Sequence, residues 1–308
     1  MQALDHYVQQ EKPLYPYLRV TTLGEFTLTH ALPTSIGRPS YHALNSAGAN
    51  SRKAAITMLK VLLCSPRRRI AKSALIEALW PRHQGINAEH ALDTTASVLR
   101  RHILYLPEET AEREDSLLQT RRINGETVFL LPDQAWLWVD ADALLKLAHT
   151  ALHKEKQGEN PLRYLEAAHL LDKGMFLEDD IQAPWSQRRR YIIDGAQRRV
   201  LYHLVDLHMQ ARRIRQAEEL LYLFLQTYPQ DEDALCRLIL LLAEQGRRQE
   251  ALHIAHYSIN IIREDKNEPA IYTQELARRI QHGLLIREQQ AAYRTIQQRS
   301  LLIIIAVA

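Results

Sequence analysis

Positively charged side chains are concentrated in one segment of this 308-residue chain. Residues 47–105 carry ten Lys and Arg side chains against three acidic ones, a net charge of +7, although the whole chain has a net charge of only +3. The ten are Arg52, Lys53, Lys60, Arg67, Arg68, Arg69, Lys72, Arg82, Arg100 and Arg101. Cationic side chains neutralise phosphate groups and release the counterions of a nucleic acid. The segment therefore predicts a surface for a polyanion, which the balanced total charge by itself does not indicate.

Side chains that carry catalysis or hold metals form no recognisable motif in the sequence. His149 and His153, like His253 and His256, have the helical spacing of a ligand pair, but no third ligand follows nearby. The sequence also lacks the Gly-x-Ser-x-Gly, His-Glu-x-x-His and Gly-rich phosphate-loop patterns. We therefore expect no enzymatic activity, no catalytic residues, no metal and no cofactor.

The basic segment contains the pattern of three short helices. They are predicted at 51–64 with Ser51 as N-cap, at 72–80, and from an N-cap at Asn87 to about residue 104. In the third helix one apolar stripe recurs at spacings of four, three and four residues: Leu92, Ala96, Leu99 and Ile103. Side chains opposite this stripe are expected to face outward, namely Thr94, Thr95, Ser97, Val98 and Arg101, with Arg100 on a flank.

Short strands are predicted on both sides of these helices. Residues 18–23 and 25–29 flank Gly24, and residues 117–122 and 127–131 flank Asn124-Gly125, a strong signal for a hairpin. The hairpin follows the third helix, where the wing of a winged helix follows its recognition helix. Residues 1–138 are therefore predicted to form a winged helix-turn-helix domain of the α+β class.

The second half of the chain is predicted to be almost entirely helical. Residues 200–231 and 234–265 repeat at an offset of 34, as in Leu201/Leu235, Leu204/Leu238 and Ala217/Ala251. This period is typical of tetratricopeptide repeats, whose helix pairs must stack to bury their apolar faces. We expect a mainly α protein, with a tetratricopeptide-like domain over 139–285 and a C-terminal helix and apolar tail over 286–308.

Several motifs in this order resemble those of the SARP-type bacterial transcriptional activators, which join an OmpR-type winged helix to a bacterial transcriptional activator domain. In the winged helix they are Leu23-Gly24-Glu25-Phe26, Arg52-Lys53-Ala54, Leu75-Ile76 with Leu79-Trp80, and Leu99-Arg100-Arg101. In the helical half they are Val139-Asp140-Ala141-Asp142, Gly174-Met175-Phe176-Leu177 with Trp185 and 188–190, and Glu268-Pro269. The sequence departs from longer relatives because it contains no ATPase phosphate loop.

The resemblance implies sequence-specific binding to double-stranded promoter DNA, as a homodimer on direct repeats, and contact with RNA polymerase. It places four residues of the third helix at DNA-reading positions: Thr95, Ser97, Val98 and Arg100. Val98 stands where an Arg is common, and a Val contacts only a thymine methyl group. The alternative for this helix is an ordinary surface helix.

Other cations are expected to support this binding. Arg121 and Arg122 of the hairpin are candidates for phosphate or minor-groove contacts, and solvated side chains are the alternative. Arg52, Lys53 and Lys72 are expected to contact phosphates, and about half of the basic run from Arg52 to Lys72 is expected to reach DNA. The resemblance implies that Arg82 and His83, between the second and third helices, contact RNA polymerase. The alternative is that this segment only connects the two helices.

Other readings of the sequence remain open. The sequence favours a DNA-binding transcriptional regulator that is located in the cytoplasm and does not bind membranes, and the family resemblance implies that it activates transcription. The alternative is a protein-interaction adaptor built of helical repeats, whose winged helix no longer reads DNA. A third hypothesis, that the chain is one part of an ATP-dependent regulator, is disfavoured because the phosphate loop is missing. The apolar tail Leu301–Ala308 is too short to span a membrane. It either docks on the repeats or a second subunit, or is the stub of a longer chain.

Overall fold

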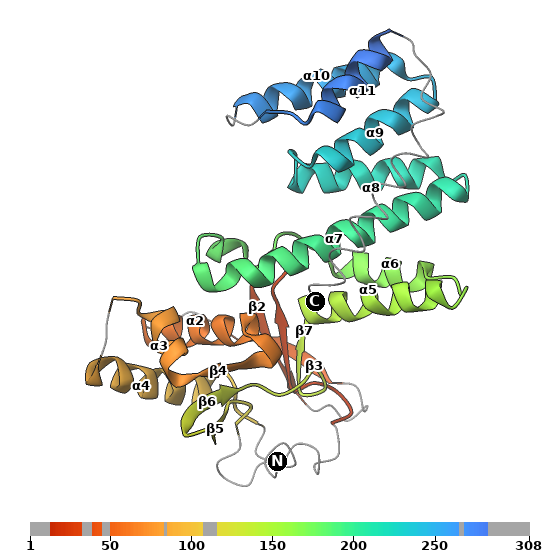
Figure 1. The fold of residues 1–308 in the computed structure, drawn as a ribbon. Coiled ribbons are helices and arrows are strands. Elements are labelled where there is room, and N and C mark those ends of the chain that lie inside the picture. Colours follow the sequence, from red (N-terminus) through yellow and green to blue (C-terminus); the bar gives the residue numbers. More distant parts are fainter. Residues whose placement is uncertain are drawn as a thin grey trace. The chain divides into compact units, whose positions relative to one another are not determined.

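A four-stranded sheet opens the chain in the computed structural model (Figure 1). The structure describes residues 13–32, 39–44, 50–82, 85–106, 116–264 and 268–282. The sheet has the order β3-β2-β1-β7, with β1 parallel to β7 and the other pairs antiparallel. Its strands are β1 (Leu18–Thr21), β2 (Thr27–Leu32), β3 (Ser40–Ala43) and β7 (Leu137–Val139). Strand β7 enters from far along the chain, so the opening sheet is completed only after the winged helix.

The predicted helices and hairpin follow the opening strands. They are α2 (Asn50–Cys64), a 3-10 turn (Pro66–Arg68), β4 (Arg69–Ala71), α3 (Lys72–Leu79), α4 (Ile86–His102), β5 (Gln119–Ile123) and β6 (Glu126–Leu130). The hairpin adds β4 to make a second sheet of order β4-β6-β5. At its turn Asn124 and Gly125 both have positive φ, at 52° and 84°, which two-residue hairpins of this twist require. Three helices followed by this small sheet form the winged helix expected from the sequence.

The remaining elements are helices, and α7 carries the chain from one compact unit to the next. Contacts divide the chain into units of residues 1–200 and 201–308, so the boundary predicted at 138/139 lies inside the first unit. The first unit also contains α5 (Asp140–Lys156), α6 (Leu162–Leu171) and a 3-10 turn (Glu178–Asp180). The others are α7 (Pro184–Gln210), α8 (Ile214–Thr227), α9 (Glu232–Glu244), α10 (Arg248–Glu264) and α11 (Ile271–Gln281).

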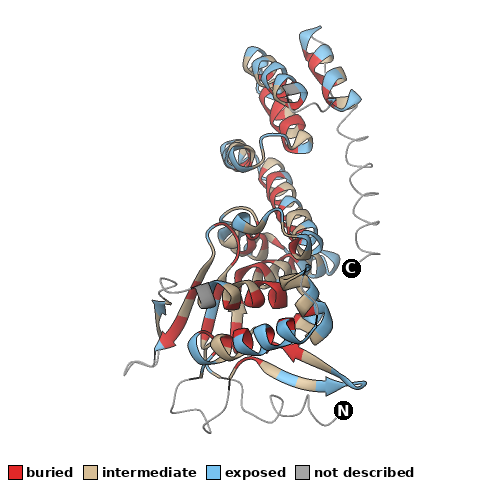
Figure 2. Ribbon diagram, turned by 90° about the vertical axis from the view of Figure 1, so that its left-hand side faces the viewer, coloured by how far each residue is buried: buried red, intermediate tan, exposed pale blue. Residues whose placement is uncertain are grey.

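The second unit is held together by an apolar core between its helices. Helix α10 begins 34 residues after α8, and the residues paired by the predicted repeat are buried: Leu201, Leu235, Leu204, Leu238, Ala217 and Ala251. Buried residues line one side of these helices and exposed residues the other (Figure 2). Asp231 caps α9 by accepting a hydrogen bond from the Ala234 amide at 3.1 Å. The helical repeat predicted from the sequence is thus confirmed.

Two glycines explain why the motifs at 23–26 and 174–177, which are distant in the sequence, lie in contact. Gly24 has a φ of 77°, and a Cβ there would lie 2.8 Å from the carbonyl oxygen of Lys173. A Cβ on Gly174 would lie 3.1 Å from the Gly24 Cα, and the Gly24 amide donates to the Met175 carbonyl at 3.0 Å. The turn after β1 therefore packs directly on the loop before α7, and both positions require glycine.

Candidate nucleic-acid interface

Helix α4 turns the predicted apolar stripe inward and packs along α2. All four stripe residues are buried: Leu92, Ala96, Leu99 and Ile103. Thr94 and Arg101 are exposed, and Ser97 and Val98 are half-buried. The Thr94 hydroxyl donates to the His90 carbonyl at 2.9 Å. Arg101 thus presents an exposed guanidinium beside the small side chains of Thr94, Ser97 and Val98.

The start of α4 differs from the prediction. The helix begins at Ile86, and Gly85 occupies the N-cap position with a φ of 90°. Asn87 lies inside the first turn and is exposed, so its assignment as the N-cap is wrong. Only a glycine adopts this backbone conformation readily, and for that reason the turn and not a side-chain cap sets the helix start.

Two residues assigned to DNA reading are engaged within the protein. Thr95 is 6% exposed and its hydroxyl donates to the Ala91 carbonyl at 2.7 Å, so the outward orientation predicted for it is wrong. Arg100 is half-buried and donates to the Leu118 carbonyl at 3.3 Å and to the Thr120 hydroxyl. Burial also lowers the pKa of the Arg100 guanidinium. Arg100 therefore fastens α4 to strand β5 of the wing.

The wing presents its two arginines differently. Arg122 is exposed and its Nε donates to the Gly125 carbonyl at 3.3 Å, whereas Arg121 is half-buried and donates to Gln119 Oε1 at 2.9 Å. Ser73 of α3 donates its hydroxyl to Glu126 at 2.5 Å, which ties the second wing strand to α3. The wing is thus held by both α3 and α4, and Arg122 lies near its tip.

Helix α2 and the turn after it supply further cations. Lys53 is exposed and Arg52 is half-buried in the first turns of α2, while Arg67 is exposed in the 3-10 turn. Arg67 has φ 53° and ψ 25°, a left-handed backbone conformation that is uncommon for a residue with a Cβ. Arg69 is half-buried in β4. The exposed charges of this segment therefore come from its helix start and its turn.

Arg68, in the middle of the basic run, is a buried structural residue. Its Nη2 lies 2.6 Å from Asp142 of α5, and its Nη1 donates to the carbonyls of Pro132 and Leu137 at 2.8 and 2.9 Å. Arg189 of α7 donates to the other oxygen of Asp142. Each nitrogen of this guanidinium is bonded within the protein, so Arg68 belongs to the part of the basic run that does not reach DNA. Its partner is 74 residues away in the sequence, which local patterns do not reveal.

Asp140, two residues before Asp142, anchors the start of α5 to the residues that follow β1. Its carboxylate accepts hydrogen bonds from the Thr22 amide at 2.8 Å, the Thr22 hydroxyl at 2.6 Å and the Leu23 amide at 3.0 Å. Burial raises the pKa of Asp140, while these hydrogen bonds act in the opposite direction. The Val139–Asp142 motif thus joins the winged helix to the helices that follow it.

Lys72, at the start of α3, faces two carboxylates of α4. Its Nζ lies 3.0 Å from Glu89 Oε2 and 3.6 Å from Asp93 Oδ1. The hydrogen bond to Glu89 is the main cause of a raised pKa at Lys72. Lys72 is 17 residues from Glu89, so the sequence provided no sign of this pairing.

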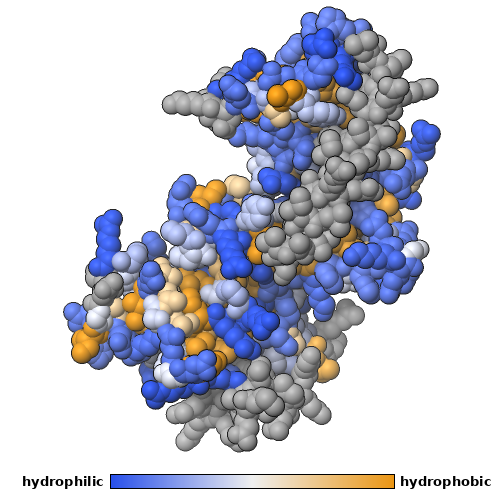
Figure 3. Space-filling view, in the orientation of Figure 1, coloured by the Kyte–Doolittle hydropathy of each residue, from blue (hydrophilic) through white to orange (hydrophobic). Residues whose placement is uncertain are grey.

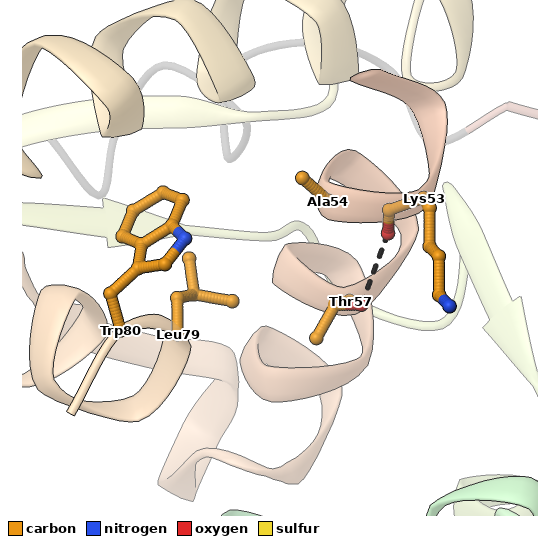
Figure 4. Close-up of a pocket in the computed structure, with 5 residues that line it drawn as sticks. All are labelled: Lys53, Ala54, Thr57, Leu79 and Trp80. Carbon is orange, nitrogen blue, oxygen red and sulfur yellow. Dashed lines mark hydrogen bonds between the residues drawn. The ribbon is translucent and has the colours of Figure 1, made fainter. Parts of the chain in front are cut away.

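A shallow hollow lies between the first turns of α2 and the end of α3 (Figure 4). Lys53, Ala54 and Thr57 line one side, and Leu79 and Trp80 line the other. Arg82 follows directly and is exposed, whereas His83 lies outside the described residues. On the face seen in Figure 3, hydrophilic side chains surround a smaller apolar area in this part of the first unit. The hollow is open to solvent and does not enclose a ligand.

In the part of the chain that the structure describes, no group of three or more His, Cys, Asp and Glu side chains is placed to hold a metal ion. Among the helices that the structure describes, none has the length and apolar character needed to cross a membrane.

Comparison with known proteins identifies the helical half of the chain. Residues 139–281 match the family model of the bacterial transcriptional activator domain. The fold is similar to that of Mycobacterium tuberculosis EmbR, solved in complex with a low affinity phosphopeptide. That match has a TM-score of 0.63 at 17% identity and covers 93% of this chain and 71% of EmbR. No curated protein matches the chain. Residues 139–281 thus contain a bacterial transcriptional activator domain, as the resemblance to the SARP-type activators predicts, and the fold of the chain is similar to that of EmbR.

Proposed function

We propose that this protein binds specific sequences in promoter DNA through its winged helix and activates transcription by contacting RNA polymerase. The observation that carries the proposal is the exposed face of α4, where Thr94 and Arg101 stand beside the half-buried Ser97 and Val98. A helix of this size fits the major groove, and an Arg donates two hydrogen bonds to a guanine edge. Arg101 is therefore the residue that we assign to base recognition.

The wing and α2 would position this helix on the duplex. Arg122 near the wing tip is placed for phosphate or minor-groove contact, and Lys53 with Arg52 is assigned to phosphates. Such contacts make the affinity fall as the salt concentration rises, and three neutralised phosphates give a slope of about −2.7 in a plot of log affinity against log salt. Arg121 and the turn residue Arg67 contribute to long-range attraction.

Contact with polymerase is assigned to the segment around Arg82. The guanidinium is exposed and the hollow lined by Leu79 and Trp80 lies next to it in the chain. An exposed cation beside an apolar hollow suits a partner surface that carries a carboxylate and an apolar side chain. Binding as a homodimer on direct repeats and a cytoplasmic location belong to the same proposal.

Titration of a labelled duplex from the region upstream of the protein's own gene tests the proposal. Wild type is expected to bind with strong salt dependence, and Arg101→Ala is expected to lose about 2 kcal/mol of binding free energy on that duplex. Arg163→Ala, which removes an exposed cation of α6, is the matched control and should bind as wild type. If binding is salt-sensitive but Arg101→Ala leaves it unchanged, α4 does not recognise bases through Arg101.

A second function, a protein-binding adaptor with a degenerate winged helix, is favoured by one observation. Arg100 and Lys72, two cations assigned to DNA from the sequence, are both engaged within the protein. An adaptor would retain partner proteins in a pull-down and would enrich no motif from random DNA.

A further inference from the structure

The exposed face of α4 carries negative as well as positive charge. Glu89 and Asp93 are four residues apart and therefore lie on the same side of the helix, and their side chains are 57% and 62% exposed. Asp93 is followed at the same spacing by Ser97, a residue assigned to the DNA-reading face. Two carboxylates at this position would repel the phosphates of a bound duplex unless a cation neutralises them.

Lys72 is the cation that faces both carboxylates. Its side chain is only 24% exposed, and its ammonium group lies 3.0 Å from Glu89 and 3.6 Å from Asp93. Lys72 begins α3, and Ser73 beside it bonds Glu126 of the wing. The ammonium group is thus directed along α4 by a segment that is itself held in place.

We propose that Lys72 is a positioning residue for recognition and not a phosphate contact: it neutralises Glu89 and Asp93 and holds them away from the DNA. This inference rests on the proposed function, and it reassigns a lysine that the sequence places among the phosphate-binding residues. It predicts that the contribution of Lys72 to binding depends on the presence of the two carboxylates.

A double-mutant cycle on the full chain separates the two roles of Lys72. The probes are a pool of duplexes selected by the wild-type protein and an unselected random pool of equal length. Lys72→Met is expected to weaken binding about tenfold in the wild-type background but less than about twofold when Glu89→Gln and Asp93→Asn are present. The Glu89→Gln/Asp93→Asn variant should bind both pools more tightly than wild type, because it removes repulsion without touching a base.

The slope of log affinity against log salt is a second readout for each variant, and a loss of structure would not produce the same change in it. A lysine that contacts a phosphate contributes about 0.9 to the salt slope in either background. We expect Lys72→Met to leave the slope unchanged when the carboxylates are neutral. Glu77→Gln, an exposed carboxylate of α3 outside the cluster, is the matched control and should alter affinity by less than about twofold. Thermal unfolding of each variant verifies that it is folded.

The possible outcomes distinguish this inference from the proposed function. If wild type binds and Lys72→Met costs the same factor in both backgrounds, Lys72 is a phosphate contact and the inference is wrong. If neutralising the carboxylates weakens binding to the selected pool alone, they read bases and the inference is also wrong. If wild type binds neither pool, the proposed function fails and the inference with it.

Discussion

Arg68 and Arg101 belong to the same basic segment, yet one is enclosed by the protein and the other faces solvent. Arg68 lies between Asp142 and two backbone carbonyls, while Arg101 is exposed at the end of α4. Arg100 is intermediate, because it is half-buried against the wing. The comparison shows that a run of positive charge combines residues that build the domain with residues free to bind a ligand. Only the tertiary contacts separate the two groups.

The largest effect is expected where the buried network is broken. Asp142→Ala leaves the Arg68 guanidinium buried without its carboxylate, and loss of a buried partner of this kind destabilises a protein by about 3 kcal/mol. Urea unfolding of the first unit, followed by tryptophan fluorescence, measures the free energy of unfolding. Glu159→Ala removes an exposed partner of Lys154 and should change that free energy by less than about 0.5 kcal/mol. Equal effects of the two substitutions would mean that burial does not distinguish these ion pairs.

Arg101→Ala is expected to show the opposite behaviour to Asp142→Ala. An exposed guanidinium contributes little to folding, so the free energy of unfolding should shift by less than about 0.5 kcal/mol. The free energy of binding to a selected duplex should fall by about 2 kcal/mol. Unfolding and anisotropy titrations on the same preparation measure both quantities. If Arg101→Ala lowers the free energy of unfolding without weakening binding, Arg101 is a structural residue and does not contact DNA.

Arg100→Ala is expected to affect both quantities to a smaller degree. The variant loses the hydrogen bonds to Leu118 and Thr120, at a cost of about 1 kcal/mol in stability. Binding should weaken because the wing is no longer fixed to α4, and amide hydrogen exchange in β5 should accelerate. Unchanged exchange in β5 together with a large loss of binding would show that Arg100 reads DNA directly.

A small pH effect should arise at the C-terminal end of α4, where His30 contacts the Ile103 carbonyl. His30 of β2 is buried, its Nε2 lies 2.7 Å from the Ile103 carbonyl, and its ring stacks on Tyr105 with centroids 4.4 Å apart. Burial lowers the pKa of His30 below its ordinary value near 6.5, so the neutral form is favoured in the folded state. The contribution of neutral His30 to the free energy of unfolding is therefore fully present above pH 6.5. It is lost as the pH falls through the pKa of His30 in the folded state.

Urea unfolding at a series of pH values from 7.5 to about 5 measures this contribution. The fall in stability should be smaller in His30→Gln than in wild type. His169 of α6 also has a pKa lowered by burial, so His169→Gln serves to separate the two histidines. An identical pH profile for wild type and His30→Gln would contradict the role assigned to His30.

Local patterns predicted much of this fold, and contacts between distant segments account for what they missed. The α4 stripe and the hairpin at Gly125 depend on neighbours a few residues away, and the 34-residue repeat is found by comparing the sequence with itself. The structure contains all three. Thr95 was misplaced because it lies at the edge of the stripe, where helical spacing alone does not decide between the two faces. The partners of Arg68 and Lys72 are set by tertiary packing, which a single sequence does not display.

The most direct test of the account is a selection of binding sites from a random duplex library by the full-length protein, followed by sequencing. We expect enrichment of a defined motif, in direct repeat if the protein binds as pairs. With Arg101→Ala, we expect one position of that motif to lose its base preference. A library that stays random after several rounds, while the protein remains folded, would contradict the claim that its winged helix recognises specific DNA.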